Sequence, residues 1–171
     1  MSNYIFPEFI KSHVVIGFQR SSNENIIKKE TEFPGVEQYL YLRGSGYPDD
    51  KLNPDMISED LWDQAKANTF AKTIILSMSN IYGVDDELPL YVVTNESFNR
   101  GAANVLDRKA LTNYFGHGTF IVVPSSIHEV LILPADEFRD LSDLDWLIND
   151  VNREEVLPEE QLGDRAYQIT L

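Results

Sequence analysis

Residues 118–134 form a strand-turn-strand pattern, which constrains the fold more than any other part of the chain. Thr119 to Val123 is a run of β-branched and aromatic residues, and Glu129 to Leu133 is predicted as a second strand that stops at Pro134. The residues between them, Pro124-Ser125-Ser126, are typical of a tight turn. Two strands joined so closely pair in an antiparallel manner, so an antiparallel sheet is expected at the centre of the fold.

The elements around this unit predict an α+β fold. A strand is expected over Leu90–Thr94, then a helix that begins after Gly101, and a last strand over Ala166–Thr170. A second helix is expected to begin at Ser142, which suits the N-cap position. The order β-α-β-β-α-β is that of a ferredoxin-like arrangement, an antiparallel sheet covered by helices. The apolar face of the first helix is predicted to comprise Ala103, Leu106, Ala110, Leu111 and Tyr114.

The N-terminal part is predicted to be rich in strands, at residues 14–18 and 38–42, with a loop between them. A turn cluster at residues 44–50 is the best boundary, so we expect an N-terminal β-rich segment over 1–53 and an α+β domain over 54–171. The N-terminal segment can belong to the same domain. A helix is expected from Ser58, and residues 73–78 fit either its extension or a strand.

The chain contains no cysteine, which excludes disulfides, thiolate metal sites and a cysteine nucleophile. Its first residues lack the pattern of a signal peptide, and no apolar run is long enough to span a membrane. We therefore expect a cytoplasmic protein without membrane association.

The charge is strongly acidic and unevenly placed. The net charge is −14, and residues 134–171 alone carry 11 acidic and 3 basic residues. Such a surface disfavours direct binding of nucleic acid and favours a basic protein partner. The alternative is that these acids form a solvated face. The side chains expected to contact a partner are Asp143, Asp150, Glu154, Glu155, Glu159 and Glu160.

The turn at residues 125–129 brings together the residue types used in catalysis. Ser125 or Ser126 could act as a nucleophile, and His128 with Glu129 could serve as acid or base. Their spacing does not imply an aligned relay, because neighbouring residues of a strand point to opposite faces. The structural alternative has the serines bonding the turn backbone and His128 capping or pairing across the sheet.

No metal site and no cofactor is expected. Only three histidines are present, and no spacing typical of a zinc or calcium site occurs. A carboxylate-based Mg²⁺ nuclease remains open, because such ligands need no characteristic spacing.

Several short motifs occur in the order found in a bacterial family known as domain of unknown function 5688. They are Tyr91-Val-Val-Thr-Asn95, Gly101-Ala-Ala103, Val123 to Pro134, Val151-Asn152, and a tail with Pro158-Glu-Glu160, Leu162, Asp164 and Tyr167. From about Ile57 to the C-terminus the chain resembles this family. The resemblance supports the extent of the domain and implies no particular activity.

These observations lead to three functional hypotheses. The first is an acidic interaction protein that binds a basic, nucleic-acid-handling protein and inhibits it by occlusion or nucleic-acid mimicry. In size and charge the chain is similar to anti-CRISPR and anti-restriction proteins, so a CRISPR or restriction nuclease is the partner expected on this hypothesis. The second is a nuclease or other hydrolase that uses His128 and nearby carboxylates. The third is a housekeeping accessory protein.

Overall fold

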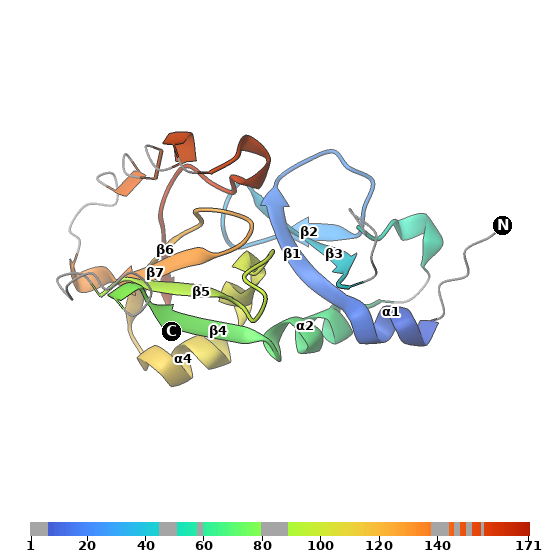
Figure 1. Ribbon diagram of the computed structural model, residues 1–171, viewed down its shortest axis with the longest axis horizontal. Coiled ribbons are helices and arrows are strands. Elements are labelled where there is room, and N and C mark those ends of the chain that lie inside the picture. The colour runs from blue at the N-terminus through green and yellow to red at the C-terminus, as the bar shows by residue number, and fades with distance from the viewer. Residues whose placement is uncertain are drawn as a thin grey trace.

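The computed structural model describes residues 7–44, 51–57, 60–79, 89–137, 144–145, 148–149, 152–154 and 156–171. Its strands form two antiparallel sheets, with short helices around them (Figure 1). The predicted α+β class is confirmed. The smaller sheet comprises β1 (Val14–Arg20), β2 (Lys28–Glu30) and β3 (Val36–Leu42), in the order β1-β3-β2. The short strand β2 lies in a segment predicted to be a loop.

The larger sheet contains the unit predicted from residues 118–134. Strands β6 (Thr119–Val123) and β7 (Val130–Pro134) pair antiparallel, with Val123 opposite Leu131. The other strands are β4 (Thr73–Ser77), β5 (Tyr91–Asn95) and β8 (Tyr167–Thr170). The order across this sheet is β4-β5-β7-β6-β8.

The edges of this sheet differ from a ferredoxin-like order, in which the last strand lies beside the first. The central strands β5-β7-β6 match that order, but β8 pairs with β6. The reason is β4, whose residues fitted either a helix or a strand in the sequence analysis. It pairs with β5 from Thr73 opposite Asn95 to Ser77 opposite Tyr91, so the position beside β5 is already occupied.

The helices are short. They are α1 (Pro7–His13), α2 (Trp62–Phe70) and α4 (Arg108–Phe115), with 3₁₀ turns η1 (Pro54–Met56), η2 (Ala102–Leu106), η3 (Ala135–Glu137) and η4 (Pro158–Glu160). The helix α1 was not predicted. Within the described residues, no helix is long and apolar enough to cross a membrane.

The single helix predicted after Gly101 is two elements, η2 and α4, because Asp107 starts a new helix. The Asp107 side chain accepts a hydrogen bond from the Ala110 N–H at 3.0 Å, which makes it the N-cap of α4. Leu111 is buried as predicted, whereas Tyr114 is half-exposed. Ser142, the predicted N-cap of the second helix, lies outside the described residues.

One hydrophobic core joins the N-terminal segment to the rest of the chain. Val14, Ile16 and Phe18 of β1 belong to the same buried cluster as Ala65 of α2 and Val105 of η2. This cluster also covers one face of the larger sheet. The opposite face packs against residues of the segment between β7 and β8, in a second cluster that contains Ile121, Val123, Leu133, Leu144 and Ile148.

Candidate functional site

The turn between β6 and β7 is the point at which three other segments of the chain meet. The carbonyl of His128 accepts hydrogen bonds from the Thr94 hydroxyl at 2.8 Å and from the Gly101 N–H at 2.9 Å. The Ile127 N–H donates to the carbonyl of Glu160 at 2.8 Å. The end of β5, the start of η2 and the turn η4 are therefore all hydrogen-bonded to residues 127–128.

The His128 side chain connects two of these segments. Its Nδ1 accepts a hydrogen bond from the Arg100 N–H at 3.1 Å, which assigns the proton of the neutral ring to Nε2. Nε2 lies 3.2 Å from Oε1 of Glu160, and both side chains are about one-third exposed. Both ring nitrogens are thus engaged, so the imidazole holds the turn before Gly101 against η4.

The two serines of the turn bond its own backbone. Ser126 Oγ accepts the His128 N–H at 3.1 Å, and Ser125 Oγ donates to the Glu129 carbonyl at 3.4 Å. The structure therefore brings Ser125, Ser126, His128 and Glu129 into one turn but aligns neither hydroxyl with the imidazole. This arrangement corresponds to the structural alternative for the serines.

Glu129 is half-buried next to His128. Burial raises the pKa of its carboxyl above the usual value, and the nearby His128 acts in the opposite direction. A half-buried carboxyl with a raised pKa is a possible acid or base.

The turn that precedes Gly101 has an unusual backbone. Phe98 and Arg100 adopt φ values of 53° and 52°, a left-handed conformation that costs a bulky residue roughly 1–2 kcal/mol. The buried Asn95 side chain holds this turn, because its Oδ1 accepts the Ser97 N–H at 3.1 Å and its Nδ2 donates to the Asn99 carbonyl at 2.8 Å. Phe98 itself is 53% exposed.

The segment around η4 carries the described part of the predicted acidic surface, and it is held in place by side-chain amides. Gln161 Nε2 donates to the carbonyls of Asn152 and Val156 at 2.7 and 3.0 Å, and Asn152 Nδ2 donates to the Gly163 carbonyl at 2.7 Å. Leu162 is buried in the main core. These contacts fix the backbone on both sides of η4.

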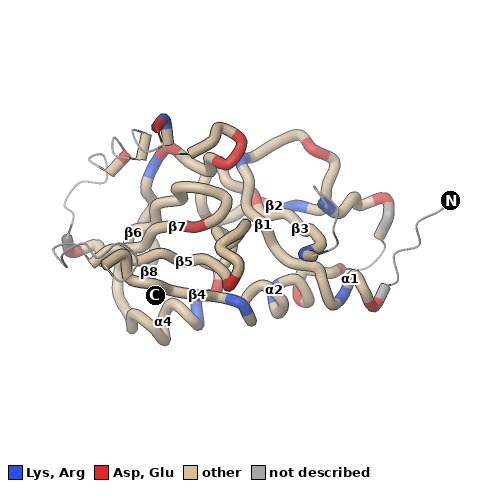
Figure 2. Tube along the Cα trace, in the orientation of Figure 1, with Lys and Arg blue, Asp and Glu red and all other residues tan. Residues whose placement is uncertain are grey.

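Three of the six predicted partner-binding acids can be placed. Glu154 and Glu159 are exposed, and Glu160 pairs with His128. Between them, Leu157 is 56% exposed. Figure 2 shows acidic positions on this segment, which lies beside the turn between β6 and β7. Asp143, Asp150 and Glu155 lie outside the described residues.

A cleft of about 270 Å³ separates η4 from the loop that follows β1. The Arg20 Nε–H crosses it to the Gln161 carbonyl at 3.2 Å. On the other wall, Lys51 pairs with Glu24 at 2.8 Å. The residues that line the cleft are Gln19, Arg20, Ser22, Glu24, Ile127, Pro158, Glu159 and Gln161.

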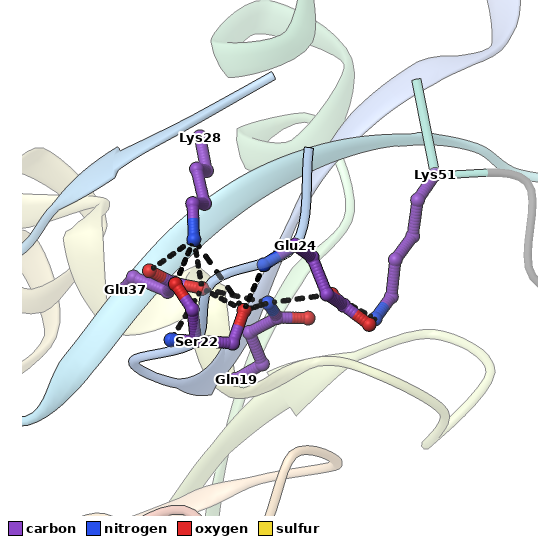
Figure 3. A network of polar contacts seen from close by, with 6 residues as sticks. All are labelled: Gln19, Ser22, Glu24, Lys28, Glu37 and Lys51. Atoms are coloured by element: carbon purple, nitrogen blue, oxygen red, sulfur yellow. Dashed lines mark hydrogen bonds and ion pairs between the residues drawn. The ribbon is translucent and has the colours of Figure 1, made fainter. Parts of the chain in front are cut away.

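The wall formed by residues 19–24 rests on a buried carboxylate, Glu37 (Figure 3). This group accepts hydrogen bonds from Gln19 Nε2 at 2.7 Å and from the Ser22 N–H and hydroxyl at 3.1 and 2.9 Å, and it pairs with Lys28 at 3.2 Å. Burial tends to raise the pKa of Glu37. The hydrogen bonds from Gln19, Ser22 and Lys28 outweigh burial and leave the pKa below its usual value.

Metal binding finds no support in the described side chains, among which no three His, Asp or Glu residues are grouped so as to hold an ion.

The comparison with protein families gives a match over residues 50–169, to a family of unknown function (DUF5688). The chain belongs to this family. The DUF5688 match contains β4 to β8 and excludes β1 to β3, so the cleft lies between the family region and the segment that precedes it. No curated protein and no solved structure matches the chain. The anti-CRISPR and anti-restriction class thus has no support beyond size and charge.

The motifs of the DUF5688 resemblance are far apart in sequence and meet in this site. Thr94, Gly101 and Glu160 are each bonded to the 127–128 turn. Sequence reasoning identified these stretches but not their meeting point. It also missed the pairing of Glu160 with His128 and the left-handed turn at Phe98, for which no residue pattern gives a signal.

Proposed function

We propose that this protein is a non-enzymatic binding protein that binds a basic, nucleic-acid-handling protein through the acidic surface around η4. The observation that carries this proposal is the exposure of Glu154, Leu157 and Glu159 on a segment fixed on both sides by side-chain amides. A surface held in its binding conformation loses little entropy on association, and exposed carboxylates speed the encounter with a basic partner.

The proposed consequence is inhibition by occlusion. A groove that binds phosphates is lined by Lys and Arg, and fixed carboxylates can occupy the same positions. On this proposal the partner is a nuclease of a bacterial defence system, and the acidic surface blocks its nucleic-acid channel. The net charge of −14 supports this class of partner.

The test uses a labelled peptide rich in Arg and Lys, with binding followed by fluorescence anisotropy at several salt concentrations. The variant E154Q/E159Q removes two charges at the proposed surface. The control E8Q/D55N removes two charges from exposed residues of α1 and η1. We expect at least about tenfold weaker binding for the first variant and less than about threefold for the control. Equal effects of the two variants would contradict the proposal.

A second candidate function is acid–base catalysis in a nuclease or other hydrolase, favoured by the raised pKa of Glu129 beside the His128–Glu160 pair. It ranks second because both nitrogens of His128 are engaged. Incubation with labelled RNA and DNA, with and without Mg²⁺, tests it. Turnover that disappears in both E129Q and H128A would place this function first.

A further inference from the structure

We infer that the turn over residues 95–100 is a preformed recognition turn, whose Phe98 side chain forms, with Leu157, the apolar centre of the partner surface. The occupant is a basic segment of the partner that carries apolar residues along one side. This inference rests on the proposed binding function and specifies the chemistry of the segment that is bound.

The backbone of the turn is the first argument. Left-handed φ angles are adopted cheaply by glycine and asparagine, and both occur here, at Gly101 and Asn99. Yet Gly101 has a φ of −88°, and the left-handed residues are Phe98 and Arg100. Such strain persists only where surrounding contacts enforce it, and it is found preferentially at functional positions. Here the hydrogen bonds of Asn95 enforce it.

The exposure of Phe98 is the second argument. The hydrogen bonds of Asn95 hold the backbone of the turn, but 53% of the Phe98 side chain is exposed, so less than half of it packs inside the protein. The other exposed aromatic residues in the described part of the chain have ring partners: Phe9 stacks on His13 at 4.1 Å, and Tyr114 lies edge-on to Phe115 at 4.8 Å. Phe98 is in no such ring pair among the described residues.

The third argument is the position of Leu157 relative to this turn. The His128 ring bonds the Arg100 N–H on one side and the Glu160 carboxylate on the other. The Glu160 N–H donates to the Leu157 carbonyl at 2.8 Å. Two segments that each carry an exposed apolar side chain are therefore fixed to opposite sides of one imidazole.

The charges around these side chains indicate the partner. Glu154 and Glu159 are exposed on either side of Leu157 along the chain, and Glu154 lies 3.5 Å from Arg153. Glu96, two residues before Phe98, is also exposed and pairs with Lys72 at 2.8 Å. An apolar centre with a polar rim is the usual form of a protein interface, and here the rim carries exposed carboxylates. A complementary segment presents Lys or Arg around apolar residues.

The experiment compares two labelled peptides of about 18 residues with the same Lys and Leu content. In one, leucine recurs every three or four residues, which gives an apolar face on a helix. In the other, the order is scrambled. We expect the full chain to bind the first peptide at least about tenfold more tightly. F98A and L157A should each remove most of this preference without changing the affinity for the scrambled peptide. Y114A, which alters an exposed aromatic on α4, should retain the preference.

In the peptide experiment, three results would overturn the inference: no preference in the unmodified protein, a preference that survives F98A, or an equal loss in Y114A. If E154Q/E159Q instead binds both peptides as tightly as the unmodified protein does, the proposed function is refuted. Denaturant unfolding of F98G checks the role of Phe98 in the fold. A midpoint equal to or above that of the unmodified protein is expected, because glycine accepts the left-handed φ. A clearly lower midpoint would show that Phe98 supports the fold and would also overturn the inference.

Discussion

Replacement of Glu37 by Gln tests the physical account of the cleft wall. The substitution keeps the size of the side chain but removes the charge that pairs with Lys28. It also places an amide N–H₂ among the donors of Gln19 and Ser22, which point at the same oxygen. The buried cluster would then contain too many donors and an unpaired cation.

The expected loss can be estimated from these contacts. Hydrogen bonds to a charged group contribute about 1.5–3 kcal/mol, and removal of one partner of a buried ion pair costs about 3–5 kcal/mol. Lys28 is itself partly exposed and can regain water, which reduces the cost. We therefore expect E37Q to lower the free energy of unfolding by about 2 kcal/mol at neutral pH.

The effect should depend on pH in a defined direction. The pKa of Glu37 is lowered in the folded state, so its ionised form stabilises the protein above the unfolded pKa of about 4.3. That contribution disappears as the pH falls through the folded-state pKa. The difference between the unmodified protein and E37Q should be largest at neutral pH and should shrink below about pH 4.

Urea unfolding at several pH values measures this difference. The matched control is E30Q, because Glu30 lies opposite Glu37 on the neighbouring strand β2 and is exposed. We expect E30Q to change the unfolding free energy by less than about 0.5 kcal/mol. The reasoning is refuted if E37Q and E30Q are equally stable, or if the cost of E37Q is the same at acidic and neutral pH.

Two further predictions concern the turn around His128. G101A should lower the free energy of unfolding by about 1–3 kcal/mol, because a Cβ at this position would meet the Thr94 hydroxyl and lie 2.8 Å from the His128 carbonyl. The control in the same denaturation assay is G118A, whose Cβ would meet only the Phe120 ring, at 3.4 Å. E129Q should stabilise the protein by roughly 0.5 kcal/mol at neutral pH, a small value because the side chain is partly exposed. Because the pKa of Glu129 is raised in the folded state, the folded protein loses stability as the pH rises from the unfolded-state pKa to the folded-state pKa. The stability gained by E129Q should therefore vanish below about pH 4. A gain in stability that persists there would contradict this account.

The sequence alone determined the local elements of the larger sheet. The alternation of side chains along β6 and β7 separates Phe120 and Val122, which face the main core, from Ile121 and Val123, which face the other cluster. The amino-acid sequence itself shows this period of two. The α+β class and the membership in DUF5688 were accessible for the same reason, since both rest on short local patterns in a given order.

The tertiary structure alone decided how these elements meet. Neither the pairing of β4 with β5 nor the contact of His128 with Glu160 has a local signal, because each joins residues that are distant along the chain. The left-handed Phe98 depends on hydrogen bonds from Asn95 and on the His128 ring that holds Arg100. The strand-turn-strand unit could thus be read from its residues, while its role as the meeting point of β5, η2 and η4 arises only when the sheet closes around it.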